Sequence, residues 1–216
     1  MSSGLTVVTH VNKDFNRDPS RCIESVKSAL PKNSQHVIVD VTGQDNMGYM
    51  MSRYESMQLD NIVVFVDDDD YITPDSLNQC LAALDHNNVG IAFTYQIRID
   101  KNGVEEISTK PTLGKVCDSP MSMHHMTAFR TKYVTDRSKR LFVENEFGVE
   151  WIMKADAISN AGAIFVPMVG YYWVQHDDQH HKLRSQQELY TKNIRAVTKE
   201  LKKWGIPDIN IPEWKI

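Results

Sequence analysis

Four consecutive aspartates, Asp67–Asp70, follow directly on the apolar segment Asn61–Val66. The β-branched and aromatic residues Ile62–Val66 predict a strand that is buried on both faces. Because four like charges repel one another and cannot enter such a core, we expect them at the carboxyl end of the strand, facing a crevice. The sequence therefore predicts an α/β sheet with an acidic site where its parallel strands end.

The acidic run also indicates a bound cation. Mg²⁺ and Mn²⁺ prefer oxygen ligands, and Mg²⁺ is commonly held by one or two carboxylates together with substrate phosphates. The alternative is a solvated acidic turn ahead of a helix, since Pro74–Ser76 is a helix-start signal. That alternative accounts for Asp75 and Asp70 but not for all four aspartates. We therefore expect Mn²⁺ or Mg²⁺ as the cofactor.

Composition favours an ordinary globular protein. The 216 residues carry a formal net charge of −4, with 41% apolar and 24% charged residues, which argues against a disordered chain or a nucleic-acid coat. Three widely spaced cysteines indicate neither a disulfide framework nor a cysteine-type zinc site. The sequence shows no signal peptide and no apolar run long enough to span a bilayer, so we expect a cytoplasmic protein.

The first 88 residues contain three strand-then-helix units. The predicted strands are Leu5–Thr9, His36–Val41 and Ile62–Val66. The first predicted helix begins at Pro19–Ser20 and has Ile23, Val26 and Leu30 on one face, with Cys22 in the core. The second runs from Met47 to Leu59. The third begins after Pro74 and buries Leu77, Cys80, Leu81 and Leu84. Successive units of this kind predict right-handed crossovers and a largely parallel sheet, with Asp40 and the Asp67–Asp70 run beside one crevice.

After residue 88 the pattern becomes mixed. A strand at Val89–Ile99, a turn at Asp100–Gly103 and a strand at Val104–Ile107 form a predicted hairpin, followed by a loop rich in Met and His. A helix at Phe147–Ala161 and a strand at Ala163–Val174, interrupted by Pro167, come next. The chain ends in a helix whose apolar residues are Tyr190, Ile194, Val197, Leu201 and Trp204, closed by Gly205 and Pro207.

Three motifs together resemble the GT-A glycosyltransferases, and most closely glycosyltransferase family 2, over residues 5 to 178. Asn16 and Arg17 precede the first helix, as in the loop of that family, and Val37–Asp40 matches its strand ending in a base-contacting aspartate. The segment Phe65–Asp70, with Pro74 at the expected distance, corresponds to its Asp-x-Asp signature. After Asp40 the sequence departs from the family, since Val41-Thr42-Gly43 stands where Asp-Gly-Ser is usual.

This resemblance implies a metal-dependent glycosyltransferase with a Rossmann-like GT-A fold, whose mostly parallel central sheet is flanked by helices and has a mixed second half. It implies a single domain over residues 1–216, with a nucleotide-binding half (1–88), an acceptor half (89–178), and a lid and C-terminal helix (179–216). The donor would be a nucleotide-diphosphate sugar, with a UDP-sugar the first choice. Contacts to it are expected from Thr9, Asn12, Arg17, Asp40, Arg53, Asp67, Asp68 and Trp151.

The catalytic base and metal ligands are likewise implied by the resemblance. Gly148–Trp151 lies where the family has Gly-Glu-Asp-Trp, so Glu150 is expected to be the base of an inverting reaction; the other role open to Glu150 is to stabilise the positive end of a helix. His176 matches the histidine of a late Tyr-x-Arg-x-His element, and the expected metal ligands are Asp69, Asp67 and His176. His124, His125 and Arg130 would line the acceptor and sugar side.

Other functions and several acceptors stay open. A nonenzymatic nucleotide-sugar binder ranks second, and a metal-dependent phosphatase of the haloacid dehalogenase type third, because Tyr71 or Ile72 stands where its motif needs Thr or Val. Seven Lys or Arg residues between His180 and Trp204, against Glu188 and Glu200, suit an anionic acceptor such as a lipid-linked sugar, a polysaccharide or nucleic acid. A viral-type enzyme that glycosylates DNA bases is a minority option.

Overall fold

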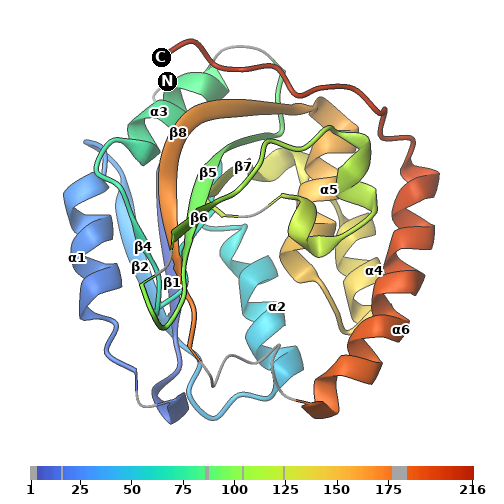
Figure 1. The fold of residues 1–216 in the computed structure, drawn as a ribbon, viewed down its shortest axis with the longest axis horizontal. Coiled ribbons are helices and arrows are strands. Elements are labelled where there is room, and N and C mark those ends of the chain that lie inside the picture. The colour runs from blue at the N-terminus through green and yellow to red at the C-terminus, as the bar shows by residue number, and fades with distance from the viewer. Residues whose placement is uncertain (1–3, 16, 86–87, 104, 124, 177–183) are drawn as a thin grey trace.

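A curled sheet with helices on both faces forms the body of the protein (Figure 1). The computed structural model describes residues 4–15, 17–85, 88–103, 105–123, 125–176 and 184–216. The strands are β1 (Leu5–Val11), β2 (Gln35–Asp40), β3 (Ile62–Phe65), β4 (Tyr71–Ile72), β5 (Ile91–Ile99), β6 (Glu105–Ile107), β7 (Thr127–Arg130) and β8 (Ala163–Val174). Within the described residues they form one eight-stranded sheet in the order β2-β1-β3-β7-β5-β8-β4, with β6 paired to β5.

Most of these strands run in one direction. β1 is parallel to both β2 and β3, whereas β7 is antiparallel to β3 and to β5. β5 therefore returns to the direction of β3, and β8 runs parallel to β5. The carboxyl ends of β1, β3, β5 and β8 consequently point toward the same edge of the sheet, which is where ligands bind in sheets of this kind. This confirms the predicted sheet, including its mixed second half.

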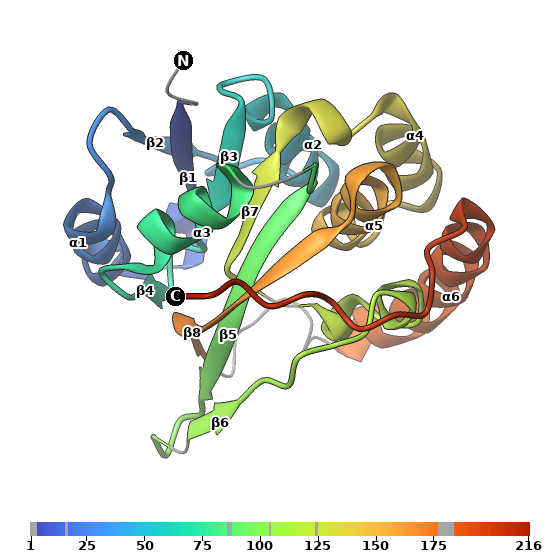
Figure 2. The same cartoon turned by 90° about the horizontal axis from the view of Figure 1, so that it is seen from above.

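The helices lie on both faces of the sheet. They are α1 (Ser20–Ala29), α2 (Asn46–Ser56), α3 (Ser76–Asp85), α4 (Asp136–Asn145), α5 (Val149–Ala161) and α6 (Arg184–Leu201), with short 3₁₀ helices η1 (Lys13–Phe15), η2 (Gly114–Cys117), η3 (Pro120–Ser122), η4 (Thr131–Tyr133) and η6 (Lys202–Trp204). Figure 2 shows α1 and α3 on one face, α2, α4 and α5 on the other, and α6 outside α4 and α5. None of the described helices has the length and apolar character needed to cross a membrane.

Alternation along the strands builds two cores, one on each face. In β1, Val7 faces the core under α1 and α3, while its neighbour Val8 faces the core under α2, α4 and α5. In β3, Val64 faces the core under α1 and α3, and Phe65 faces the core under α2, α4 and α5. Because successive side chains of a strand point to opposite faces, a continuous apolar run is what a strand covered on both sides requires.

The last residues pack across the edge of β8. The Phe165 amide donates to the Pro212 carbonyl at 2.9 Å, and the Trp214 amide donates to the Phe165 carbonyl at 2.7 Å. Ile211 is 1% exposed and joins the core under α5. In Figure 1 this segment runs from the end of α6 back over the top of β8. The described C-terminal segment therefore covers the half of β8 that β4 leaves unpaired.

Several predicted elements need correction. Thr127–Arg130, which lies in the expected loop, forms β7 between β3 and β5. The polar segment Asp136–Asn145 forms α4, which has few apolar residues to reveal it. Pro167 does not interrupt β8, because the strand bulges there: Thr94 pairs with Val166 and Tyr95 with Val169. The buried face of α1 consists of Cys22, Val26 and Ala29, while Ile23 and Leu30 are only partly buried.

Candidate active site

Asp70 ties the acidic loop to β8. Its carboxylate accepts hydrogen bonds from the Tyr171 hydroxyl at 2.7 Å and from the Val174 amide at 2.8 Å, and the residue is 1% exposed. Burial, together with the charges of Asp69 and Asp67, raises the pKa of Asp70 well above its usual value. The Tyr171 hydroxyl also accepts the Asp67 amide at 3.2 Å. Asp70 therefore positions the loop and does not face a ligand.

Asp68 fixes the acidic loop to the segment after β1. The Asn12 amide donates to Asp68 at 3.2 Å, and Arg17 lies 3.9 Å from its other oxygen. Burial raises the pKa of Asp68, the Asn12 bond lowers it, and the charges of Asp69 and Asp67 raise it further. The predicted donor-binding residues Asn12, Arg17 and Asp68 therefore come together.

Asp69 has two partners on one oxygen. Arg17 Nη1 lies 2.9 Å from Asp69 Oδ2, and His176 Nε2 lies 2.5 Å from the same atom. The side chain of Asp69 is 15% exposed and that of His176 is 25% exposed, so a ligand at the sheet edge can reach both. The structure thus brings together Arg17, Asp69 and His176, which were predicted from three separate parts of the sequence.

These residues fit a divalent cation shared with a diphosphate. Among the described residues, no group of three or more His, Cys, Asp or Glu is arranged to hold a metal ion by itself. A cation that also binds substrate phosphates needs only one or two protein carboxylates, and a carboxylate with an imidazole suits Mn²⁺. Asp69 and His176 supply such a pair, and a bound cation would replace the hydrogen bond between them. Asp67 lies in the same loop but is held by Arg53.

Arg53 joins Asp67 to Glu150. From α2 its Nη2 donates to Asp67 Oδ1 at 2.5 Å and to the Tyr49 hydroxyl at 2.6 Å, while Nη1 donates to Glu150 Oε1. Burial alone would lower the pKa of Arg53, because it disfavours the charged guanidinium. The interactions with Tyr49 and Asp67 have a larger total effect, so the pKa of Arg53 is raised. Burial likewise opposes the charge of Asp67, yet Arg53 and His125 hold the pKa of Asp67 below its usual value. Both partners therefore stay ionised.

Glu150 lies in the first turn of α5, close to the side chains of His125 and Lys154. Gly148 caps this helix with φ 71°, a left-handed conformation that glycine adopts readily. Glu150 Oε2 lies 3.4 Å from His125 Nδ1 and 3.7 Å from Lys154 Nζ. His125 also lies 3.8 Å from Asp67 and stacks on Tyr171. The structure thus places Glu150 and His125 together at the same edge as Asp67.

Lys154 is a site residue that sequence reasoning missed. It is 4% exposed, and its Nζ donates to the Met123 carbonyl at 3.2 Å. Burial and then the charge of Arg53 lower its pKa to about 7, against a smaller opposite effect of Asp67. A signal was present in the sequence: apolar residues occupy every face of α5, so a lysine within it must be buried, and its i+4 position brings it to Glu150.

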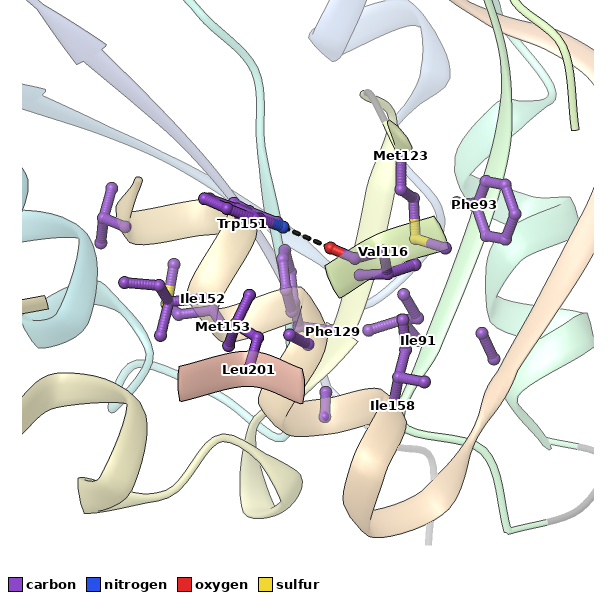
Figure 3. Close-up of a cluster of buried hydrophobic side chains, with 14 of the residues drawn as sticks. Ile91, Phe93, Val116, Met123, Phe129, Trp151, Ile152, Met153, Ile158 and Leu201 are labelled. Atoms are coloured by element: carbon purple, nitrogen blue, oxygen red, sulfur yellow. Dashed lines mark hydrogen bonds between the residues drawn. The ribbon is translucent and has the colours of Figure 1, made fainter. Parts of the chain in front are cut away.

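Trp151 does not face the site, contrary to expectation. Figure 3 shows its indole in the core under α5, where Nε1 donates to the Val116 carbonyl. It is 4% exposed and packs edge-on against Phe147. Each residue of an α-helix is rotated about 100° from the one before it, so Glu150 and Trp151 point in different directions. Trp151 therefore anchors the helix that carries Glu150.

The side chains of two predicted donor-binding residues are bound to groups outside the acidic loop. Thr9 is fully buried, with its hydroxyl 3.0 Å from His36 Nε2 and 3.6 Å from Cys22 Sγ. Asp40 ends β2 at the expected edge, but its exposed carboxylate accepts a hydrogen bond from Lys13 at 2.6 Å. The hydrogen bonds from Lys13 and Thr42 lower the pKa of Asp40. Thr9 is therefore a core residue, since its side chain points under α1.

Arg130 does not agree with the expected acceptor-side position. β7 is antiparallel to β3, and Arg130 pairs with Ile62 at the amino end of that strand, so it lies at the opposite edge from Asp67. There its guanidinium donates to the Leu84 carbonyl and lies 4.0 Å from Asp85. The antiparallel direction of a strand that was not predicted explains the error. His124, Asn16 and the segment 177–183 lie outside the described residues.

Comparison with known proteins identifies the fold. No protein-family model and no curated protein matches the sequence. The S. aureus protein TarS, a GT-A glycosyltransferase, superposes with a TM-score of 0.63 at 15% identity, over 94% of this chain and 40% of TarS. Its fragment 1–349 in complex with UDP-GlcNAc gives 0.60 at 14% identity, over 94% of this chain and 68% of the fragment. The complex with UDP gives 0.54 at 15% identity, over 94% and 67%.

The chain has a GT-A fold. This confirms the predicted fold class, and the resemblance to glycosyltransferase family 2 is consistent with it. At 40% of the length of TarS, the chain spans less than half of that protein. In this GT-A fold the residues that converge are Asn12, Arg17, Arg53, Asp67, Asp68, Asp69, His125, Glu150 and His176.

Proposed function

We propose that the chain transfers a sugar from a UDP-sugar to an acceptor hydroxyl, with inversion at the anomeric carbon. The observation that carries the proposal is the convergence of Asp67 and Glu150 on Arg53 at the carboxyl edge of the sheet. The GT-A fold supports it, since the solved neighbours include complexes with UDP-GlcNAc and UDP. The same fold favours transfer over the phosphatase alternative.

Glu150 lies at the edge of the sheet with one carboxylate oxygen bound by Arg53 and the other 3.4 Å from His125 and 3.7 Å from Lys154. In the proposed step the acceptor oxygen bonds to the anomeric carbon, its proton passes to Glu150, and the bond from that carbon to the diphosphate oxygen breaks. UDP leaves with the bonding electron pair. General base catalysis of this kind contributes roughly 10²–10⁴-fold to rate.

The other side of the site receives the developing charge on UDP. Arg17 lies at the surface of the acidic loop, 2.9 Å from Asp69, and can turn its guanidinium toward a diphosphate. Asp69 and His176, with Asp67 beside them, would hold Mn²⁺ or Mg²⁺, which when bound supplies Lewis-acid stabilisation of the leaving diphosphate. Asp67 and Arg53 would orient the donor between this side and Glu150.

Replacing the base tests the proposal without knowledge of the acceptor. Water can serve as the acceptor, so slow release of UDP from a panel of UDP-sugars reports the chemical step. Glu150→Gln is expected to bind UDP as the parent protein does and to lose UDP release by about 10²–10⁴-fold. Glu144→Gln, at an exposed position of α4, is the matched control and should behave as the parent. Unchanged release by Glu150→Gln would remove Glu150 as the base.

A nonenzymatic UDP-sugar binder is the second candidate. Arg53 donates to one carboxylate oxygen of Glu150, so Glu150 also has a structural role, which is to join α5 to Arg53 on α2. UDP binding by the parent protein with no UDP release from any donor, in the presence of Mn²⁺ or Mg²⁺, would favour this candidate.

A further inference from the structure

The outer edge of β2 is open. Within the described residues β2 is the end strand of the sheet, and Figure 2 shows it on the outer side of β1. The Val41 amide donates to the Val11 carbonyl at 3.0 Å, so Val41 directs its backbone groups toward β1. Backbone groups of successive strand residues point to opposite sides. His36, Ile38 and Asp40 therefore direct their N–H and C=O groups toward the open edge.

The other edge strands are protected, whereas β2 is not. An open row of backbone groups pairs with further chains, and proteins prevent this with short strands, charged residues, proline or a bulge. β4 has only two residues, and β6 has three, of which Glu105 and Glu106 are charged. β2 is six residues long, has no lysine or proline, and keeps its register with β1 without a bulge. At its centre Ile38 is 49% exposed. Among the described strands, β2 therefore has the edge best suited to accept another strand.

The sequence of β2 is complementary to itself in the antiparallel direction. With Ile38 on a two-fold axis, Ile38 faces Ile38 of the second copy, and His36 faces Asp40 on either side of the axis. The backbone groups of all three residues point outward, so each facing pair can exchange N–H···O=C hydrogen bonds. Their side chains share one face of the sheet, because alternate residues of a strand do. An imidazole is thus opposite a carboxylate at two positions.

The carboxylate of Asp40 can accept one more hydrogen bond. It is exposed, and it already accepts from Lys13 Nζ at 2.6 Å and from the Thr42 amide at 3.0 Å. An ionised carboxylate has about four acceptor positions, and an imidazole can donate to it whether neutral or protonated. The charge of Asp40 therefore suits pairing with a histidine of a second copy rather than with another carboxylate.

We propose that β2 pairs antiparallel with β2 of a second copy of this chain, in the register that places Ile38 on the two-fold axis. The inference goes beyond the proposed function and does not depend on it. Because the joined strands are antiparallel, the carboxyl edges of the two sheets point in opposite directions, and each copy keeps its own acidic loop. Specific interfaces bury roughly 800 Å² per partner, and one short strand supplies only part of this, so the dimer should be weak.

Sedimentation velocity of the full chain tests the inference, over concentrations from about 1 µM to about 1 mM. We expect a reversible monomer–dimer equilibrium. Ile38→Lys places two like charges opposite each other on the axis and should raise the dimer dissociation constant at least about tenfold. Ile107→Lys, at an exposed position on the edge strand β6, is the matched control and should dimerise as the parent does. Equal midpoints of urea unfolding would show that both variants keep the fold.

Cross-linking tests the register and decides the inference even if the lysine variant is unstable. Facing residues of such a pair lie about 5.5 Å apart, so a short bis-maleimide should link Ile38→Cys into a dimer, and Ile107→Cys should stay unlinked. The native cysteines, Cys22, Cys80 and Cys117, are buried. A monomer at every concentration, a dimer that Ile38→Lys does not weaken, or equal linking at positions 38 and 107 would overturn the inference.

Discussion

Arg53 holds two carboxylates that come from distant parts of the chain. It is 4% exposed, and its guanidinium contacts Asp67 after β3 and Glu150 on α5. The rings of Tyr49 and Phe65 lie 5.3 and 5.1 Å from its central carbon, so the charge is also flanked by aromatic rings. This one side chain sets the distance between the proposed donor site and the proposed base.

Removing Arg53 should destabilise the fold. Arg53→Met leaves Asp67 and Glu150 without their shared counter-charge, and breaking a buried ion pair in this way typically lowers stability by about 3–5 kcal/mol. Urea unfolding at pH 7 measures the change. Adding Asp67→Asn should recover part of the loss, because one uncompensated charge is then removed. Arg140→Met on the exposed side of α4 should stay within about 0.5 kcal/mol of the parent. A similar small effect of Arg53→Met would contradict the account.

Lys154 should make stability depend on pH. Its pKa is about 7 in the folded protein, against 10.5 as its ordinary value. Between these values the unfolded chain binds more protons than the folded one, so stability rises with pH over this window. The free energy of unfolding of the parent, minus that of Lys154→Met, should therefore increase from pH 7 to pH 10 by up to about 1.4 kcal/mol per pH unit. Parallel pH profiles from urea unfolding would exclude a buried lysine of lowered pKa.

At the scale of elements, β8 carries the residues that hold the acidic loop. Tyr171 and Val174 bind Asp70, and the next residues lead to His176. Just before them the strand bulges and passes very close to β5. A Cβ on Gly170 would lie 2.3 Å from Thr94 Oγ1, so only glycine allows this approach.

Gly170→Ala should separate β8 from β5 and disturb the acidic loop. We expect a loss of about 1–3 kcal/mol in the free energy of unfolding, as for other overpacked sites, together with weaker UDP binding. Thr94→Ala introduced with it removes the two closest atoms and should restore part of both losses. Gly48→Ala, on α2, serves as a control, because the nearest atoms to the added Cβ are side-chain atoms of Asp45 and Gln44 at 3.2 Å or more. An unchanged Gly170→Ala protein would show that the strands are not held at this distance.

The first half of the fold could be predicted from sequence because its signals are local. Ile62–Val66 is apolar throughout, so a strand covered on both faces follows from its composition. The burial of Asp68 and Asp70 does not follow from it, because Asp70 is held by Tyr171 and Val174 of the distant strand β8. β7 could not be predicted in the same way. Thr127–Arg130 is four residues long, and its place between β3 and β5 arises from pairing with strands remote in sequence. Arg130 was misplaced for the same reason.

The site shows the same division between local and tertiary information. Glu150 could be proposed from its neighbours Gly148 and Trp151, but nothing local reveals that Arg53, 97 residues away, binds it. The family resemblance implies a donor contact from Trp151, whereas the helix turns this residue into the core. Contacts of this kind depend on how α2 and α5 pack together, which the sequence pattern does not specify.

At the scale of the whole molecule, the GT-A sheet brings the proposed donor-binding residues and the proposed base to one edge. Arg17, Asp69 and His176 gather at the acidic loop, and Glu150 lies on α5. Arg53 on α2 links Glu150 to Asp67 of the acidic loop. The central claim is that this edge binds a nucleotide-diphosphate sugar through the acidic loop.

Calorimetric titration of UDP-, GDP-, CMP- and dTDP-sugars tests that claim most directly, with Mn²⁺, with Mg²⁺ and with a chelator. We predict that UDP-sugars bind in the presence of a metal ion, that the chelator weakens binding, and that Asp69→Asn abolishes the metal-dependent part. Asp75→Asn, outside the Asp67–Asp70 run, should bind as the parent does. Absence of binding by every nucleotide sugar under all three conditions would contradict the account and leave the acidic run as a structural turn.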